Sequence, residues 1–330
     1  MELKNPYETN YYKFYILIAL AILIIAASAI PNLKLGIDLT GGTAMTTKVN
    51  DATSSNQLKN FILDKGISDV TVKLTENPLS GEKGVVIEYT GHRDILQARE
   101  LISSDPEQAR SLVSKFVPPG SANLTVNEYV ETAELNFRES LKQDIANQVG
   151  VKPNQISVSS VGASIGSVFW ETSQRALILA FVLISAIVFI LFRQLVPSIA
   201  VIQAIFFNVI VALAGMTILG IPMTLPTIVA LLMIIGYSID SDIMLVDKII
   251  RRSTGTTAER AFSALKTGLT MTGTTLTVLL VLLFFSNFSQ MTTLFQITGV
   301  LFFGLLGDLP STYMVNAVIV KWWQDKQESS

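Results

Sequence analysis

The sequence contains no cysteine and a single histidine, His92, and these two shortages exclude several kinds of site. Without cysteine the chain has no disulfide framework, no catalytic thiol and no thiolate metal ligand. One histidine excludes a zinc site built from several histidines and disfavours acid–base catalysis by histidine. The loops that hold nucleotide phosphates, G-x-x-x-x-G-K-[ST] and G-x-G-x-x-G, are also missing. We therefore expect no metal centre and no bound cofactor.

Charged residues are scarce as well. Asp, Glu, Lys and Arg make up 15% of the 330 residues, and the formal net charge is -2. Soluble proteins usually contain about a quarter of charged residues, so the deficit indicates a chain in contact with lipid. The sequence has no basic block, which argues against a nucleic-acid partner.

Half of the residues are hydrophobic, and they fall into long runs. A helix that crosses the hydrocarbon core of a membrane needs about 20 predominantly apolar residues. Six runs meet or approach this length, so the sequence predicts a membrane α-helical bundle with six transmembrane helices. The predicted spans are 14–30, 176–192, 199–219, 225–246, 269–285 and 294–320.

The segment between the first two spans, residues 34–172, has the composition of an ordinary globular domain. Its predicted elements follow the order strand, helix, strand, strand, helix, strand, with one extra helix, which is compatible with a ferredoxin-like α+β domain. The chain is thus expected to divide into an N-terminal tail with the first span, the α+β domain, five further spans and a short C-terminal tail. These parts are 1–33, 34–172, 173–323 and 324–330.

Basic residues of the short loops lie on one side of the predicted bundle, and the loops 220–224 and 286–290 on the other side carry no charge. Cytoplasmic loops carry the excess of Lys and Arg, so we expect a protein of the cell membrane with both termini in the cytoplasm. The 34–172 domain is then outside. The competing interpretation of the first span is a cleaved signal peptide, although its apolar run exceeds the usual signal core. The basic residues are Lys4, Lys13, Arg193, Lys248, Arg251, Arg252, Arg260, Lys266, Lys321 and Lys326.

Three carboxyl side chains fall inside predicted spans, where an ionised acid costs about 2.5–3.5 kcal/mol on insertion scales. The fourth span holds Asp240 and Asp242, and the sixth holds Asp308 next to Pro310. Asp242 lies about 200° around the helix from Asp240, so the two cannot face the same neighbour. We expect Asp240 to bind a proton or a coupling cation, with Asp308 as the second candidate and Asp242 as a weaker one. The alternative is that these acids are buried, hydrogen-bonded or ion-paired struts.

Two features predict close helix packing beside these acids. Pro310 has no amide hydrogen and frees the carbonyl group of Leu306, so the irregular backbone and Asp308 are expected to face the bundle interior. The fifth span has a stripe of small and hydroxyl side chains, which can bind a carboxyl group or serve packing alone. The stripe comprises Thr270, Gly273, Thr274 and Thr277, and Gly236 on the fourth span would let a helix approach Asp240.

Four short motifs occupy defined places in this topology: L-G-I-D-L-T-G-G-T at 35–43, V-G-A-S-I-G at 161–166, G-Y-S-I-D at 236–240 and K-T-G-L-T-M-T at 266–272. The first three resemble G-I-D-F-x-G-G, V-G-P-x-V-G and G-Y-S-I-[ND] of the SecF family, and the fourth fits it as well. G-D-L-P-S-T-Y at 307–313 is similar to the archaeal branch. The residues that match the motifs are Gly36, Asp38, Gly41, Gly42, Gly236, Tyr237 and Ser238.

This resemblance implies the fold of half a resistance–nodulation–division (RND) transporter, with SecD as the other half. It implies an accessory subunit of the Sec translocase, not an enzyme, that helps to export proteins with the energy of a proton or other ion gradient. The implied partners are SecD, the SecY translocon, exported preproteins and the lipid membrane. Many relatives have Asn-Asp where this chain has Asp240-Ser241, and often an acid where it has Asn208. The titrating acid is therefore placed at Asp240, and no acid role is assigned to position 208.

Two other functions are compatible with parts of the pattern. A half-transporter that exports small molecules or lipids would share the fold and the intramembrane acids. It would differ by an aromatic substrate cleft or by measurable efflux. An intramembrane aspartyl protease would also use two acids, but its G-x-G-D motif is replaced by Leu305-Leu306-Gly307-Asp308.

Overall fold

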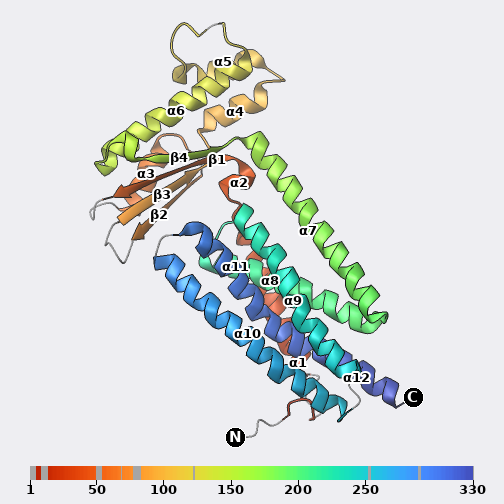
Figure 1. Ribbon diagram of the computed structural model, residues 1–330. Coiled ribbons are helices and arrows are strands. Elements are labelled where there is room, and N and C mark those ends of the chain that lie inside the picture. Colours follow the sequence, from red (N-terminus) through yellow and green to blue (C-terminus); the bar gives the residue numbers. More distant parts are fainter. Residues whose placement is uncertain are drawn as a thin grey trace. The chain divides into compact units, whose positions relative to one another are not determined.

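The computed structural model describes residues 5–8, 14–49, 54–67, 69–76, 83–121, 123–251, 254–288 and 291–329. The chain forms two compact units. The helical unit comprises Met1–Leu35, Glu171–Asn287 and Met291–Ser330, and the sheet unit comprises Gly36–Trp170 with Phe288–Gln290. Figure 1 shows both units, coloured along the sequence.

Within the described ranges, six helical segments are long and apolar enough to cross a membrane, which confirms the predicted number of spans. Glycine at the left-handed position Gly220, with φ of 64°, ends the third span. The segments are α1 (Phe14–Ala29) with the 3-10 turn η2 (Ile30–Asn32), α7 (Ala163–Phe192), α8 (Leu195–Leu219), α9 (Leu225–Arg251), α10 (Thr257–Phe288), and α11 (Thr292–Pro310) continued by η5 (Ser311–Asn316) and α12 (Ala317–Glu328).

The sixth span is irregular near its middle. Pro310 is the last residue of α11, and the following segment η5 is a π-helix rather than an α-helix. Proline removes one backbone donor from the helical ladder, and single π-turns inside α-helices often mark functional sites. The irregular backbone expected at Pro310 is therefore present, and it separates two regular helical segments.

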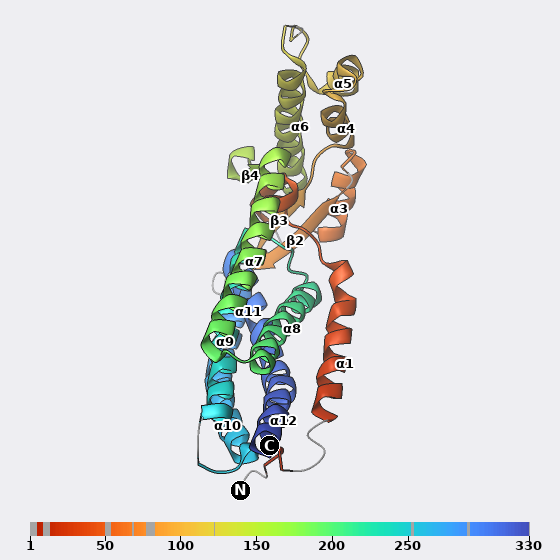
Figure 2. The same ribbon diagram turned by 90° about the vertical axis from the view of Figure 1, so that its right-hand side faces the viewer.

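The centre of the helical unit is made by α8, α9 and α11. Half or more of the α8 and α9 spans is buried (61% and 50%), whereas only 11% of α1, 6% of α7 and 17% of α10 is buried. Glycines allow α11 to approach both neighbours closely: a Cβ on Gly307 would lie 2.8 Å from Val211 of α8, and one on Gly304 would lie 2.2 Å from Ile234 of α9. The arrangement is visible in Figures 1 and 2.

The sheet unit has the predicted ferredoxin-like order of elements. Four strands form one antiparallel sheet in the order β2-β3-β1-β4, and α3, α4 and α6 lie on one face of it (Figure 1). Residues 77–82, where the sequence predicts a turn between the second and third strands, lie outside the described residues. The elements are β1 (Gly42–Val49), α3 (Ser55–Asp64), β2 (Val70–Glu76), β3 (Lys83–Tyr89), α4 (Arg93–Leu101), α5 (Pro106–Val113), α6 (Val126–Val149) and β4 (Ser157–Val161).

The core of the sheet unit follows from the two periodicities of its elements. Alternate strand residues such as Met45 and Ile87 point to the helical face and are almost fully buried. On α6, Leu141 and Ile145, four residues apart, are buried against the same face. The long helix is also well capped, because Thr125 and Glu128 form a reciprocal capping box at its first turn.

Candidate functional site

Asp308 is the centre of a buried polar cluster between α8, α9 and α11. Its side chain is completely buried, as expected for an acid that faces the bundle interior. Oδ1 accepts hydrogen bonds from Asn208 Nδ2 and Ser238 Oγ, both at 2.8 Å. Oδ2 accepts a hydrogen bond from Ser241 Oγ at 2.8 Å. Ser311 Oγ holds the amide of Asn208 in place through a 2.7 Å bond to Asn208 Oδ1.

Asp242 belongs to the same cluster and is likewise fully buried. Its Oδ1 accepts hydrogen bonds from Thr312 Oγ1 at 2.9 Å and from Asn316 Nδ2 at 2.8 Å. Thr312 Oγ1 also lies 3.2 Å from Asp308 Oδ1. A hydroxyl group has one hydrogen and can donate it to only one carboxylate at a time. The two acids are therefore linked through a shared group whose hydrogen bond depends on which of them carries a proton.

The spacing of the polar residues explains why they meet. Asp308, Thr312 and Asn316 recur every four residues on the sixth span, and Ser238 and Asp242 do so on α9. Residues four apart share one face of a helix. The close approach of α11 at Gly304 and Gly307 brings these faces together.

The chemistry of the pair follows from its surroundings. Within the described part of the chain, both carboxyl groups are held by hydroxyl and amide groups rather than by Lys or Arg. Two neighbouring carboxylates without a counter-charge repel each other, and burial penalises each charge further. Such a pair can keep a proton or take up a small cation, and it can exchange either when its surroundings change.

Three buried oxygen atoms of this region have no hydrogen-bond partner among the described residues. They are Asp242 Oδ2, Asn316 Oδ1 and the hydroxyl oxygen of Tyr313. Buried polar groups in proteins are almost always hydrogen-bonded, often to ordered water. The unpaired oxygens are therefore suited to water molecules or to a cation beside Asp242.

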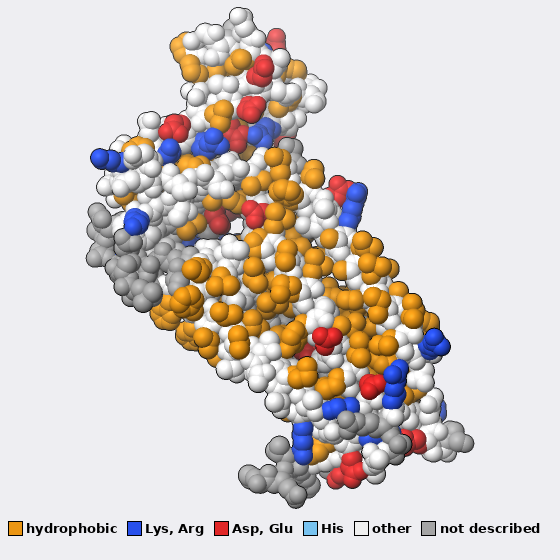
Figure 3. Space-filling view, in the orientation of Figure 1, with side chains coloured by type: hydrophobic (Ala, Val, Ile, Leu, Met, Phe, Trp, Pro, Cys, Tyr) orange, Lys and Arg blue, Asp and Glu red, His pale blue; other side chains and the backbone are white. Residues whose placement is uncertain are grey.

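Asp240, the acid preferred on sequence, is not part of this cluster. Its side chain and the neighbouring Gly236 are exposed on α9, and Figure 3 shows acidic side chains within the hydrophobic surface of the helical unit. On α10, Thr270, Thr274 and Thr277 of the predicted stripe are also exposed. Tyr237 joins the two helices, because its hydroxyl lies 2.5 Å from Thr275 Oγ1. The structure thus brings Asp242 and Asp308 together and leaves Asp240 on the surface.

Several residues of the cluster were given no role by the sequence prediction. Ser241 and Thr312 contact the acids directly, Ser311 orients Asn208, and Asn316 holds Asp242. The signal that could have found them is the four-residue spacing of polar side chains on the sixth span. Asp308 and Pro310 are conspicuous in the sequence, whereas the uncharged polar residues of this stripe are not.

The glycine-rich motif of the sheet unit forms a tight turn. The short helix α2 (Ile37–Thr40) is preceded by Gly36 and carries Asp38 in its first turn. It ends at Gly41, whose φ is 79°, and Gly42 follows with φ of 146°. A Cβ on Gly42 would lie 2.6 Å from the carbonyl oxygen of Tyr89, so only glycine fits there. The motif therefore has a clear structural role where the chain leaves the first span.

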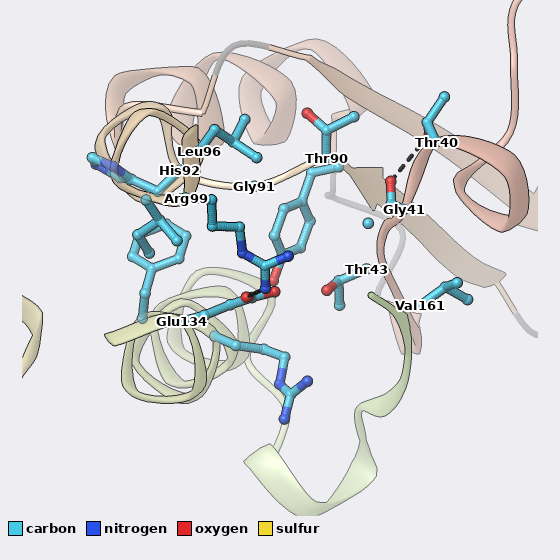
Figure 4. A pocket seen from close by; sticks show the side chains of 15 residues that line it. Thr40, Gly41, Thr43, Thr90, Gly91, His92, Leu96, Arg99, Glu134 and Val161 are labelled. Atoms are coloured by element: carbon cyan, nitrogen blue, oxygen red, sulfur yellow. Dashed lines mark hydrogen bonds and ion pairs between the residues drawn. The ribbon is translucent and has the colours of Figure 1, made fainter. Parts of the chain in front are cut away.

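A small cavity of about 50 Å³ lies beside this turn (Figure 4). Arg99 and Glu134 form an ion pair on its wall, so their charges compensate each other. The buried hydroxyl of Tyr89 has no hydrogen-bond partner among the described residues, and burial raises its pKa to about 12. At roughly 30 Å³ per water molecule, the cavity has room for one or two waters.

His92, on the wall of this cavity, is a structural residue. Its Nδ1 accepts a hydrogen bond from the backbone N–H of Asp94 at 3.1 Å and so caps α4. Its ring packs edge-on against Phe116 and Phe137. Burial lowers the pKa of the imidazole, which keeps it neutral. Among the described residues, no group of three or more His, Cys, Asp or Glu side chains is arranged to hold a metal ion.

The fold and the cluster define a class of membrane protein: six spans with a ferredoxin-like domain after the first, and a buried acid pair between the third, fourth and sixth. Residues 141–326 match the family model for the C-terminal region of the protein-export membrane proteins SecD and SecF. The protein-export membrane protein SecF of Methanocaldococcus jannaschii is 31% identical over 93% of this chain and 92% of its own length. SecF of Methanopyrus kandleri is 30% identical over 97% of this chain and 98% of its own. The chain belongs to the SecD/SecF family of protein-export membrane proteins.

A solved structure supports the fold. The crystal structure of SecDF, a translocon-associated membrane protein from Thermus thermophilus, matches 98% of this chain with a TM-score of 0.67. The sequence identity is 22%, so this likeness concerns the fold alone. The present chain spans 40% of the length of that SecDF chain. It therefore corresponds in fold to one part of that larger protein.

Proposed function

We propose that this chain is an accessory subunit of the Sec protein translocase that helps to export proteins across the membrane with the energy of an ion gradient. The observation that carries the proposal is the buried pair Asp242 and Asp308 in a member of a protein-export family. Ionisable groups inside a membrane are costly and commonly mark ion or proton pathways. No cofactor or chemical reaction is part of this function, so the chain is not an enzyme.

Coupling would use the protonation or cation occupancy of the acid pair. When both acids are charged, their repulsion favours one helix arrangement. When a proton or cation is bound, that repulsion is removed and another arrangement is favoured. The π-helix that contains Thr312 is the element best suited to change, because its hydrogen bonding is already irregular. Asp242 and Asp308 would then form the centre of the ion path, while Asp240 lies apart from them on the surface of α9.

The partner in this proposal is SecD. A polar strip on the surface of the helical unit supports it, because Asp240, Gly236 and the threonines of α10 lie within membrane-spanning helices yet are exposed. Lipid tails cannot hydrogen-bond a carboxylate, so a second membrane protein must cover the strip. The SecY translocon and the exported preproteins complete the set of partners, as the family resemblance implies.

The proposed orientation places both termini in the cytoplasm and the 34–172 domain outside the cell membrane. The helical unit supports this arrangement, because its N-terminal segment and α12 lie at the same end in Figures 1 and 2. Lys248 and Arg251 lie in the last turn of α9, and Lys326 lies in the last turn of α12. An excess of basic residues marks the cytoplasmic side.

The experiment that tests this function is preprotein translocation into inverted membrane vesicles that contain this chain, SecD and the translocon. An imposed ion gradient should stimulate export by the wild type, and Asp308→Asn should abolish the stimulation at equal protein level. Asp247→Asn is the matched control, because Asp247 lies on α9 but pairs with Arg251 on the surface. Stimulation that survives Asp308→Asn would remove the coupling role, and gradient-driven efflux of a small molecule or lipid would favour the half-transporter instead.

A further inference from the structure

The segment before the first span, Asn5–Glu8, is folded into the helical unit. Tyr7 is only 2% exposed and Asn5 only 8%. Asn5 stabilises a turn, because its Oδ1 accepts a hydrogen bond from the backbone N–H of Tyr7 at 3.0 Å and its Nδ2 donates to Glu8 at 3.1 Å. This preformed turn presents the ring of Tyr7 to the bundle.

Tyr7 is bound to the irregular part of the sixth span. Its hydroxyl donates a 2.8 Å hydrogen bond to the backbone carbonyl of Tyr313, which directly follows Thr312 in the π-helix. The two tyrosines belong to one apolar cluster with residues of α8, α9, α10 and α12. The contact therefore joins the N-terminal segment to the backbone that carries the shared hydroxyl of the acid pair.

Tyr313 fills the space between α9 and α10. A Cβ on Gly268 of α10 would lie 1.5 Å from the Tyr313 hydroxyl and 3.3 Å from Met244 of α9, so the ring fits only because residue 268 is glycine. Tyr313 is five residues beyond Asp308 in the direction of Lys321. The two rings thus occupy the side of the cluster that leads to the basic end of the helices.

The polar groups of the acid cluster follow one another in the same direction, toward the basic end of the helices. Asp308 is linked through Thr312 to Asp242. Beyond this link come the unpaired oxygens Asp242 Oδ2, Asn316 Oδ1 and the Tyr313 hydroxyl. These atoms are equipped to hold water or a cation, while the described side chains around Tyr7 and Tyr313 are largely apolar. The unpaired polar atoms therefore lie next to the apolar cluster that contains both tyrosines.

We propose that the segment Asn5–Glu8 is a gate that closes the basic-end route to Asp242 and Asp308. In the closed state Tyr7 is bound to the Tyr313 carbonyl and separates the unpaired oxygens from the bulk solvent at the basic end. In the open state the turn withdraws, and water or a small hydrated cation reaches Asp242. The biological use of the gate depends on the proposed ion coupling. The closure of the gate depends only on the contacts of Tyr7 and Tyr313.

Cysteine accessibility tests the gate directly, because the chain has no cysteine of its own. Ser311→Cys places a nearly isosteric thiol beside Asp308, at a site that is completely buried. The full chain, with its partner, is reconstituted in vesicles and treated from the basic-end side with a small, charged, membrane-impermeant thiosulfonate reagent. The measured quantity is the rate at which the thiol introduced at position 311 is labelled in different Tyr7 backgrounds.

We expect labelling at least tenfold faster with Tyr7→Ala than with wild-type Tyr7. Tyr7→Phe, which keeps the ring and loses the hydrogen bond, should give an intermediate rate and protects the test against a misfolded alanine variant. Trp322→Ala on α12 is the matched aromatic control, because this ring is 49% exposed, and it should leave the rate unchanged. Thr254→Cys, in an exposed loop, should label equally in every background. It therefore measures how much of the protein faces the reagent.

Equal labelling rates of the Ser311→Cys protein with Tyr7, Tyr7→Phe and Tyr7→Ala would overturn the gate. This result is independent of export activity. If Asp308→Asn leaves gradient-stimulated export intact, the ion-coupling function fails, while a labelling difference between the Tyr7 variants would still establish the closure.

Discussion

Asp308 and Thr312 lie one turn apart on the sixth span, and Thr312 Oγ1 is 3.2 Å from Asp308 Oδ1 while it donates to Asp242 Oδ1 at 2.9 Å. The hydroxyl thus connects acids from two different helices. Any change in the charge of one acid changes the hydrogen bond available to the other. Thr312 is for this reason the most informative single position in the cluster.

Replacing Thr312 with valine should uncouple the two acids. Valine has nearly the same shape but no hydroxyl, so Asp242 loses one of its two hydrogen-bond donors. We expect gradient-stimulated export to fall tenfold or more, with Thr312→Ser close to wild type because serine retains the donor. Translocation assays at matched expression measure the difference. Comparable activity of the valine and serine variants would show that the hydroxyl is not needed.

The three intramembrane acids should respond differently to neutralisation. Asp242→Asn and Asp308→Asn alter the buried cluster and are expected to abolish gradient stimulation. Asp240→Asn changes an exposed side chain and should mainly weaken association with the partner subunit, measured by co-purification with SecD in mild detergent. This order reverses the ranking of Asp240 and Asp242 made from the sequence. A full loss of coupling with Asp240→Asn alone, at normal association, would restore the original ranking.

Labelling of single cysteines should establish the orientation. In intact cells, Thr254→Cys near the basic end should be shielded from an impermeant thiol reagent, and Ser111→Cys in the sheet unit should react. Both positions are exposed, so accessibility within the protein does not limit the reaction. Lysis should make Thr254→Cys reactive as well. The opposite pattern in intact cells would invert the proposed topology.

Gly304 should be intolerant of even one added methyl group. A Cβ there would lie 2.2 Å from Cδ1 and 2.8 Å from Cγ1 of Ile234, and overpacking of this kind costs about 1–3 kcal/mol. Thermal unfolding in detergent should show a lower transition temperature for Gly304→Ala, with recovery when Ile234→Ala removes the clash. Gly273→Ala is the control, because nothing lies within 4 Å of a Cβ at that position. Equal stability of the two alanine variants would contradict the close approach of α11 and α9.

Acidification should loosen the start of α4. Burial holds the folded-state pKa of His92 below its usual value of 6.5, so the unfolded chain binds a proton that the folded chain does not. Stability is therefore complete above pH 6.5 and declines as the pH falls below it. Protonation of Nδ1 also removes the cap on Asp94. Hydrogen exchange at the first amides of α4 should accelerate as the pH falls below 6.5, after correction for intrinsic rates, and His92→Asn should abolish this pH dependence.

Much of the architecture could be predicted because it depends on local patterns. Apolar runs such as 199–219 are long enough to require a membrane, and α8 was found at Leu195–Leu219. On α6, the four-residue spacing of Leu141 and Ile145 is a local pattern of the same kind, and both side chains are buried. The sequence of elements is compatible with a ferredoxin-like sheet, and the strand order β2-β3-β1-β4 agrees with that topology.

The site was harder to predict because it depends on which faces of three helices meet. Helix periodicity correctly separated Asp240 from Asp242, but it could not show which of the two faces lies inside. Which face lies inside depends on the glycines of α11, because they allow α8 and α9 to approach this helix closely near Asp308. The role of Tyr7 was also beyond local reasoning, because its hydrogen-bond partner is 306 residues away in the chain.

The π-helix at Ser311–Asn316 sets the rotation of α12, the helix that follows it. A π-turn accommodates one more residue than an α-turn, so its conversion to regular helix would advance the downstream register by one position, a rotation of about 100°. At present Lys321 is directed inward, with 8% exposure, and Trp322 is directed outward, with 49%. A change of winding in this short segment would turn a different side of α12 inward, so a local event beside the acids can be transmitted as a rotation of this helix.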